Sequence, residues 1–407
     1  MSDGNAENHW RRTLWAMVSV QFIISSAFSI IPPVIPLLLP ALGVRTPGAV
    51  RAWAGVLIGV TPLAAALMSP WWGRLADQID RRAIILIACG TAAACTASMS
   101  LVTHPWQLLA LRFAMGLFGG HVAAGMALVS TAAPAARLGW ALGWVAAAQL
   151  AGTLLGPVIG GSIADAFASY RAPFVSAGAA ALLVGAAIAM VPAQASLAPG
   201  LQGAPPARHA SALLSKYREL STLVIVLLLA QCAIMSPQPI ISLHVRELVG
   251  QRSDLATLAG FAFSIVALSG LLASPLLGTL GDAIGARRVL LMGVIVAAPC
   301  TLMQAFAPTY GWFVAERFLG GLFLAGIIPT VNTLIGKSVA PTDRGQTYGL
   351  AAGATFFGAF LGPVVGGLMG AQLGLSSVFF LSGGVLLINA IWIAIRLAPV
   401  PTPLRDI

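Results

Sequence analysis

Residues 154–161 read LLGPVIGG, and residues 360–367 read FLGPVVGG. Each stretch lies inside an apolar run and places three glycines and a proline in eight positions, although both residue types weaken helices. The two copies are 206 residues apart, measured from Gly156 to Gly362. Such an unusual pattern at a fixed offset indicates a chain built from two copies of one unit.

Two further motifs repeat in the same order. WGRLADQIDRR (72–82) matches LGTLGDAIGARR (277–288), and LRFAMGLFGG (111–120) matches ERFLGGLFLAG (316–326). The offset is 205 residues both from Gly73 to Gly278 and from Arg112 to Arg317. One Gly-rich match would be weak, but three matches at nearly one offset indicate duplication.

The composition is that of a membrane protein. The chain has 407 residues, of which 58% are hydrophobic and 8% charged, and its mean hydropathy is +0.91; a soluble domain carries about 25% charged residues. Apolar runs long enough to span a bilayer recur about twelve times. We therefore predict an all-α integral membrane protein with twelve transmembrane helices in two pseudo-symmetric six-helix bundles. The bundles are residues 1–192 and 219–407, joined by a linker over 193–218.

The net charge of +10 comes from Lys and Arg residues dispersed among short loops, so nucleic-acid binding is not expected. Fifteen of the 22 Lys and Arg residues lie in segments on the side of the N-terminus, five lie on the other side, and Arg112 and Arg317 lie within spans. The positive-inside rule then predicts that both termini and the linker are cytoplasmic.

No phosphate-binding loop, metal-ligand cluster or catalytic elbow is present, so we expect no enzyme, no cofactor and no metal. The four cysteines lie in apolar runs without paired spacing and are expected to be buried free thiols. The expected partners are the lipid bilayer, a small-molecule substrate and an ion gradient, and we expect a monomer.

The motifs resemble those of the major facilitator superfamily, and within it the twelve-span drug:proton antiporters, over nearly the full chain. The repeated loop matches the pattern G-x-L-a-D-r-x-G-r-[RK], except that Asp80 stands where the family usually has glycine. Arg112 and Gly116 match the R-x-x-x-G pattern of the fourth span. The antiporter motif G-x-x-x-G-P-x-x-G-G is complete as Gly152, Gly156, Pro157, Gly160 and Gly161.

The resemblance implies a proton-coupled multidrug efflux transporter of a bacterial-type inner membrane, working by alternating access. In the family the loop motif forms a latch between the two halves, which implies a conformational latch of Gly73, Asp77, Arg81, Arg82, Gly278, Asp282, Arg287 and Arg288. The alternative is an ordinary positively charged loop neutralised by nearby acids.

Four residues are candidates for proton coupling: Arg112, Glu316, Arg317 and His121. A charge inside a span is costly and usually faces a cavity or a partner. Glu316 lies inside an apolar run, where burial and a nearby guanidinium shift a carboxyl pKa in opposite directions. The alternatives are a structural pairing of Glu316 with an arginine, snorkelling of Arg112 to the interface, and simple packing of His121.

A drug cavity needs apolar and aromatic walls with few polar groups. The candidates are Gln21, Phe22, Ser25, Phe28, Met115, Gln149, Gln231, Met235, Gln238, Phe356 and Phe357, and most of them are expected to face lipid or to pack between helices. Two other functions stay open, namely a proton-coupled symporter or exporter of one metabolite, such as a sugar, organic acid or siderophore, and a membrane scaffold. We also expect Gly152, Gly156 and Gly160, which share one helix face, to form a contact surface between the two moving halves.

Overall fold

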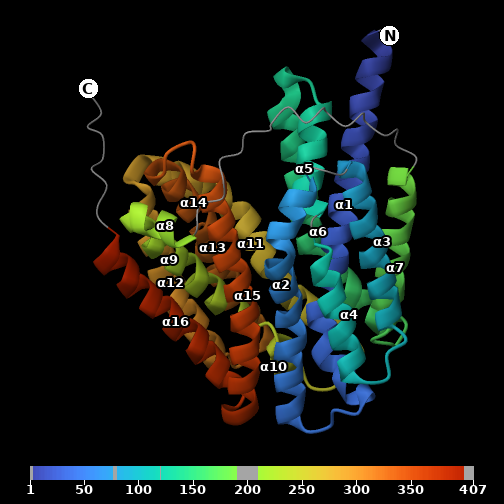
Figure 1. The fold of residues 1–407 in the computed structure, drawn as a ribbon. Coiled ribbons are helices and arrows are strands. Elements are labelled where there is room, and N and C mark those ends of the chain that lie inside the picture. Colours follow the sequence, from blue (N-terminus) through green and yellow to red (C-terminus); the bar gives the residue numbers. More distant parts are fainter. Residues whose placement is uncertain (1–2, 77–79, 120, 190–209, 398–407) are drawn as a thin grey trace. The chain divides into compact units, whose positions relative to one another are not determined.

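The computed structural model describes residues 3–76, 80–119, 121–189 and 210–397, and the regular elements in these ranges are helices (Figure 1). The α-helices are α1 (Asp3–Leu38), α2 (Pro47–Ala76), α3 (Arg81–Met99), α4 (Pro105–Leu117), α5 (His121–Ala132), α6 (Leu138–Ala166), α7 (Ala172–Ala189), α8 (Ala210–Lys216), α9 (Arg218–Met235), α10 (Ile241–Val249), α11 (Leu255–Ile284), α12 (Ala286–Met303), α13 (Tyr310–Leu324), α14 (Ile327–Ser338), α15 (Arg344–Leu373) and α16 (Leu375–Arg396). The 3-10 helices are η1 (Leu39–Leu42), η2 (Ala135–Arg137) and η3 (Gln304–Phe306).

The helices account for the twelve spans expected from the sequence. Within the described residues, ten helical segments are long and apolar enough to cross a membrane, one of them formed by α13 and α14 together. The seventh span begins with the shorter apolar helix α9 and continues into α10. The remaining span, the fourth, consists of α4 followed by α5.

Three spans consist of two helices each, and the break between the two helices falls at prolines or glycines. Pro237 and Pro239 lie between α9 and α10, and neither has a backbone N–H to continue the helix. Gly119 lies between α4 and α5, and Gly326 between α13 and α14. Glycine costs about 1 kcal/mol in a helix interior relative to alanine, so these positions favour a break.

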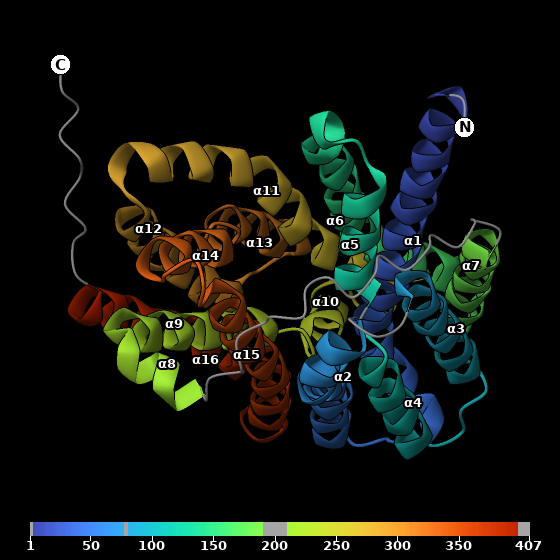
Figure 2. The same cartoon turned by 45° about the horizontal axis from the view of Figure 1, so that its top comes forward.

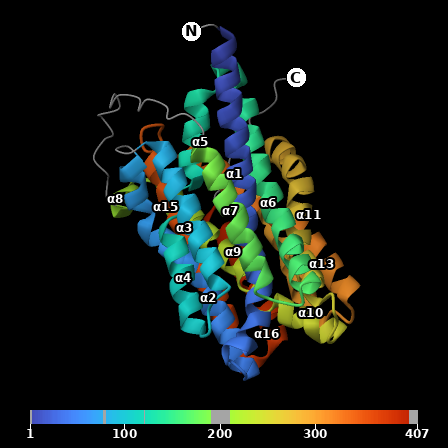
Figure 3. The same ribbon diagram turned by 90° about the vertical axis from the view of Figure 1, so that its right-hand side faces the viewer.

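Contact clustering divides the chain into two compact units. Unit 1 comprises residues 1–45, 60–202 and 251–264. In its described part α1 packs against α6 and α7, and α7 packs against α3 (Figure 3). The core between these helices contains Leu14, Met17, Ile85 and Val145.

Unit 2 comprises residues 46–59, 203–250 and 265–407. Its described helices include α9, which packs against α15 and α16, and α12, which packs against α16 (Figure 2). Leu223, Val226, Val294 and Val331 lie in the core of this unit.

Two short segments belong to the unit that contains mainly the other predicted half of the chain. Residues 46–59, at the start of α2, belong to unit 2, and residues 251–264, at the start of α11, belong to unit 1. The predicted linker 193–218 lies outside the described residues as far as residue 209, and its described end contains α8, whose Leu213 is buried. The bundle limits 1–192 and 219–407 stay a prediction.

Candidate functional site

The first Gly-Pro motif lies in α6 and packs mainly against α1. Gly152, Gly156 and Gly160 recur every four residues and share one face. A Cβ atom at Gly156 would lie 2.8 Å from the Ser26 carbonyl oxygen, and one at Gly160 would lie 2.8 Å from Ile30 Cγ2. The expectation that this face lies between the two halves is therefore wrong. The glycines instead let α1 and α6 of one half approach closely, which is how membrane helices associate.

The other end of the motif contacts α11, a helix of the second half. A Cβ atom at Gly161 would lie 2.8 Å from Thr257 Cα, and the carbonyl of Pro157 lies against Gly260. Both α6 and the start of α11 belong to unit 1. The motif therefore serves two contacts, one within its own half and one with a segment of the other half.

The second copy makes the same two kinds of contact. Glycines at 358, 362 and 366 of α15 lie against α9; Cβ atoms at Gly358 and Gly362 would lie 2.5 Å from the carbonyl oxygens of Leu228 and Cys232. Gly367 lies against α2, where its Cβ atom would be 2.6 Å from the Arg51 carbonyl oxygen. The duplication seen in the sequence thus extends to the packing of each motif.

Arg112 is buried on α4, with 3% of its surface exposed. The Thr61 hydroxyl of α2 donates a hydrogen bond to the Arg112 carbonyl oxygen at 3.0 Å. A Cβ atom at Gly116 would lie 2.7 Å from Ala64 Cβ, so glycine at the end of the R-x-x-x-G pattern brings α4 onto α2. This close packing fixes the backbone of α4 at Arg112 against α2.

Glu316 and Arg317 are both buried on α13 but have different partners. Trp312 Nε1 donates to Glu316 Oε1 at 2.5 Å, and Glu316 Oε2 is buried without a hydrogen-bond partner among the described residues. Arg317 Nη1 donates to Gln304 Oε1 at 3.4 Å, and its guanidinium lies 5.6 Å from the Phe313 ring centre. Adjacent side chains on a helix point about 100° apart, so Glu316 and Arg317 face different surroundings.

His244 of α10 belongs to the same region and was missed from the sequence. It is 6% exposed, and its ring centre lies 4.9 Å from that of Phe313 and 5.1 Å from that of Phe379. Its Nδ1 is 3.9 Å from a carboxylate oxygen of Glu247. No local pattern in the sequence indicates this position, because the rings that surround it, Phe313 and Phe379, lie far away in the chain.

The loop motifs tie each half to its own last helix. Arg82 donates from Nε to the Ile188 carbonyl at 3.3 Å, near the end of α7, and also contacts the Ala189 carbonyl. Arg287 donates in the same way to the carbonyls of Leu397 at 2.6 Å and Ala394 at 3.2 Å, at the end of α16. Cations are favoured at the negative C-terminal ends of helices.

Asp80, which departs from the family pattern, caps α3, because its carboxylate accepts a hydrogen bond from the Arg82 backbone N–H at 3.0 Å. Gly285, in the second copy, has a φ of 95°, which favours glycine. Asp282 is exposed. Asp77 lies outside the described residues, and the structure describes only the backbone of Gly73, Arg81 and His121.

The cavity candidates are distributed over both units. Gln21, Phe22, Ser25, Phe28, Met115 and Gln149 belong to unit 1, and Gln231, Met235, Gln238, Phe356 and Phe357 belong to unit 2. Ser25 lies at the crossing with Gly152, and Gln231 and Met235 lie at the crossing of α9 with α15. Phe356 and Phe357 are 36% and 45% exposed, whereas Gln21 is fully buried and its amide atoms have no hydrogen-bond partner among the described residues.

Comparison with known proteins identifies the family. The family model described as Major Facilitator Superfamily matches residues 17–252 and 223–406. The chain belongs to the Major Facilitator Superfamily. The multidrug resistance protein MdtG of Dickeya zeae (strain Ech586) is 32% identical over 397 residues, covering 97% of each chain. The MdtG protein of Salmonella typhi is 31% identical over 393 residues, covering 96% of this chain and 97% of the relative.

Solved structures of other transporters share this major facilitator fold. A bacterial homologue of the human lysosomal transporter Spinster, in an inward-facing and occupied conformation, aligns with a TM-score of 0.78 at 15% identity, over 96% of this chain and 99% of that chain. The nucleoside transporter NupG aligns with a TM-score of 0.75 at 14% identity, over 95% and 100%. The predicted fold class is confirmed, and the protein is a multi-pass membrane transporter, not an enzyme.

Proposed function

We propose that this chain is a proton-coupled antiporter that exports amphipathic drugs by alternating access. The observation that carries the proposal is the identity of 32% to the multidrug resistance protein MdtG over 97% of both chains. The alignment covers nearly the whole of both chains, so it includes the loops and the helices that carry the motifs. The complete motif from Gly152 to Gly161 supports export. We further propose that the protein acts as a monomer in a bacterial inner membrane with both termini in the cytoplasm.

Alternating access requires that the proton and the drug differ in affinity for two conformations. In transporters built from repeats, the substrate site lies near the membrane midplane at the repeat interface, and the repeats rock around it. The repeated crossings of α6 with α1 and of α15 with α9 would keep each repeat rigid during this motion. The conformational latch would be formed by the eight loop residues Gly73, Asp77, Arg81, Arg82, Gly278, Asp282, Arg287 and Arg288.

Glu316 is the proposed proton carrier. One of its oxygens is buried without a hydrogen-bond partner among the described residues, and a buried charge without a partner is costly. A proton on the carboxyl would remove that charge and supply a donor. Arg317, Arg112 and His121 are proposed to assist proton coupling.

The drug would be held by apolar contacts and a few polar groups drawn from the cavity candidates. Phe356 and Phe357 offer exposed aromatic rings, and Gln21 offers an amide with unused donors and acceptors. Such a lining fits chemically varied amphipathic compounds better than one hydrophilic metabolite.

A drug-susceptibility panel in an efflux-deficient bacterial host tests the substrate class. Cells that express the wild type should tolerate several unrelated cationic or neutral amphipathic drugs, with minimal inhibitory concentrations raised several-fold. Arg112→Lys and Arg112→Ala should lose this protection while membrane levels, measured by immunoblot, stay at the wild-type level. Arg252→Ala serves as the control because Arg252 lies on an exposed loop. Protection against no drug, together with competition by a single hydrophilic metabolite, would favour the metabolite transporter instead.

A further inference from the structure

Four tryptophans form a continuous row of rings across the beginnings of α1 and α6, two helices that pack along each other (Figure 3). The ring centres of Trp10 and Trp140 are 6.5 Å apart, and those of Trp140 and Trp144 are 6.1 Å apart. The ring centre of Trp144 lies 5.3 Å from that of Trp15, which ends the row. Trp10 is buried, whereas Trp15, Trp140 and Trp144 are 46%, 52% and 41% exposed. Unit 1 therefore presents three half-exposed indoles side by side.

An arginine precedes each end of the exposed row by three residues. Arg12 comes before Trp15 on α1, and Arg137, the residue directly before α6, comes before Trp140. Both arginines are exposed. A helix rises about 4.5 Å over three residues, so each guanidinium group is attached one turn before its indole. Positive charge thus precedes the rings at the start of both spans.

The surroundings of the row are positively charged. Residues 10–16 and 134–145 contain three arginines and no aspartate or glutamate, and the acids Asp3 and Glu7 come earlier in the sequence. The third arginine, Arg11, has its guanidinium 5.8 Å from the ring centre of Trp10. Among the described residues, the N–H groups of the three exposed indoles find no hydrogen-bond acceptor. The row therefore offers positive charge together with unused donors.

The second repeat lacks this surface. The offset of 206 residues also applies to α1, because the carbonyl oxygens of Phe22 and Leu228 lie against corresponding glycines of the two Gly-Pro motifs. At this offset Asp343 stands in place of Arg137. The positions of the four tryptophans are occupied by Lys216, Ser221, Gln346 and Leu350. The shared fold therefore does not require the row, which belongs to the first half alone.

We propose a binding site for the headgroup of an anionic phospholipid of the cytoplasmic leaflet, formed by Trp15, Trp140, Trp144, Arg12 and Arg137. Tryptophans gather at membrane–water interfaces, where the ring meets apolar chains and the N–H meets polar groups. Both spans begin on the side of the N-terminus, which the positive-inside rule predicts to be cytoplasmic, and that leaflet carries anionic lipids. The site requires this orientation but neither antiport nor a drug.

The charge decides between a lipid and a drug as the occupant. A cationic drug would stack on the indoles but would be repelled by the arginines. The phosphate of a lipid suits both groups, because guanidinium groups form strong charge-assisted hydrogen bonds to phosphate oxygens, and the indole N–H groups can donate to the remaining oxygens.

A lipid bound there would join α1 to α6 at the end of their crossing. Trp15 comes seven residues before Phe22, whose carbonyl oxygen faces Gly152, and Trp144 comes eight residues before Gly152. The row therefore lies about two turns from the first close contact of the two backbones. A ligand of the folded state stabilises it, so the lipid should raise the thermal unfolding midpoint of the wild type.

Native mass spectrometry of the full chain in detergent tests the site. The probe is palmitoyl-oleoyl phosphatidylglycerol, and phosphatidylcholine with the same chains is the uncharged comparison, which the wild type should bind more weakly. Arg12→Gln combined with Arg137→Gln should weaken phosphatidylglycerol binding about thirtyfold, equivalent to about 2 kcal/mol for two lost charges. Arg12→Lys combined with Arg137→Lys keeps the charge and should keep most of the affinity. Trp15→Leu combined with Trp144→Leu should weaken binding several-fold and tests the site if the glutamine variant does not fold.

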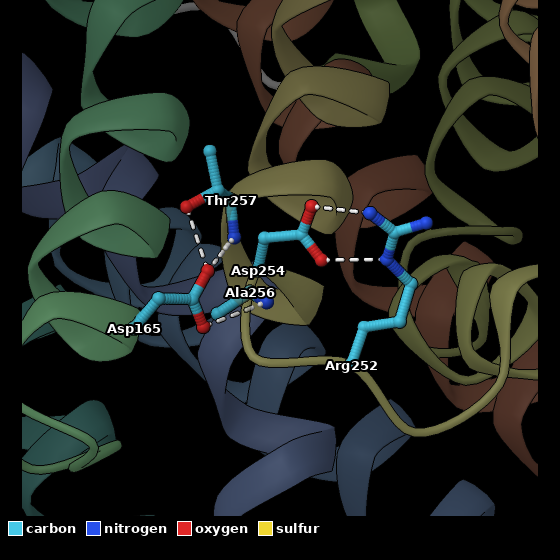
Figure 4. A network of polar contacts seen from close by, with 5 residues as sticks. All are labelled: Asp165, Arg252, Asp254, Ala256 and Thr257. Atoms are coloured by element: carbon cyan, nitrogen blue, oxygen red, sulfur yellow. Dashed lines mark hydrogen bonds and ion pairs between the residues drawn. The ribbon is translucent and has the colours of Figure 1, made fainter.

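Two other exposed arginines give matched controls. Arg396 lies at the end of α16 in unit 2, with its guanidinium 5.2 Å from the Trp392 ring centre. Arg252 lies in the loop before α11, and its guanidinium donates to the Asp254 carboxylate at 2.8 and 3.0 Å (Figure 4). Arg396→Gln and Arg252→Gln should leave the affinity for phosphatidylglycerol unchanged. Equal weakening by Arg396→Gln would assign the binding to general surface charge and overturn the site.

Two further results would overturn the site. The first is an unchanged affinity for phosphatidylglycerol in the folded glutamine variant, or equal wild-type affinities for the two lipids. The second uses tetraphenylphosphonium, an amphipathic cation: if the leucine variant loses this cation but keeps phosphatidylglycerol, the row binds drug instead. Lipid binding needs neither a gradient nor transport, so a protein that binds the lipid and moves no drug would support the site and defeat the proposed function.

Discussion

Asp343 holds the beginning of α15 to the segment that leads into α9. It is 5% exposed, and its Oδ2 accepts hydrogen bonds from Lys216 Nζ at 2.6 Å and the Tyr217 hydroxyl at 2.8 Å. Asp343→Ala should lower the thermal unfolding midpoint of the purified protein because a buried acceptor for two donors is lost. Asp254→Ala removes a carboxylate that is 45% exposed and should change the midpoint little. Equal midpoints for the two variants would contradict this account.

The contact between Lys216 and Asp343 also predicts how the unfolding midpoint depends on pH. The hydrogen bond from Lys216 to Asp343 raises the pKa of the lysine ammonium above its ordinary value of 10.5. A raised pKa means that the stabilisation is fully present below the ordinary value and is lost as the pH rises through the folded-state value. The difference in midpoint between wild type and Asp343→Ala should therefore stay constant from about pH 6 to pH 9. A difference that changed across this range would assign the stabilisation to another group.

At the scale of helices, the Gly-Pro motif now has two separable roles. Gly156→Leu would push a side chain into Ser26 and Ser29 of α1, inside one half, and overpacking of this kind costs about 1–3 kcal/mol. We therefore expect less folded protein and a lower unfolding midpoint, measured by size-exclusion chromatography after heating. Gly143→Leu, on the same helix, has open space around it and serves as the control. A Gly156→Leu protein that is as stable as the control but does not transport would contradict this packing role. It would favour a contact that moves during transport.

The helices also show where sequence patterns suffice and where they do not. Apolar runs and the repeat offset predicted the spans and the matching of α6 with α15, because bilayer thickness fixes the length of a spanning helix. They could not assign Gly156 to α1, since a glycine face records close packing but not the identity of the neighbour. The surroundings of His244 depend on Phe313 and Phe379, which are far away in the sequence, so no local pattern indicated this residue.

For the whole molecule, the central claim is that drug and proton are exchanged across the membrane. Glu316 was found from the sequence as a charge in an apolar run, and the structure adds a single hydrogen bond from Trp312 and a buried oxygen with no partner among the described residues. We propose that this carboxyl couples transport to a proton gradient, with one conformation holding the proton and the other releasing it.

Everted membrane vesicles test this claim most directly. With an acidic interior, addition of a drug that passes the susceptibility panel should release protons from wild-type vesicles, read as recovery of acridine orange fluorescence, while the drug accumulates inside. Glu247→Gln, a change at an exposed carboxyl of the same half, should behave as the wild type does. Glu316→Gln should abolish proton release and uphill accumulation at equal protein levels. Undiminished proton release per drug in Glu316→Gln would contradict the assignment of Glu316, and drug accumulation without any proton release in the wild type would contradict antiport itself.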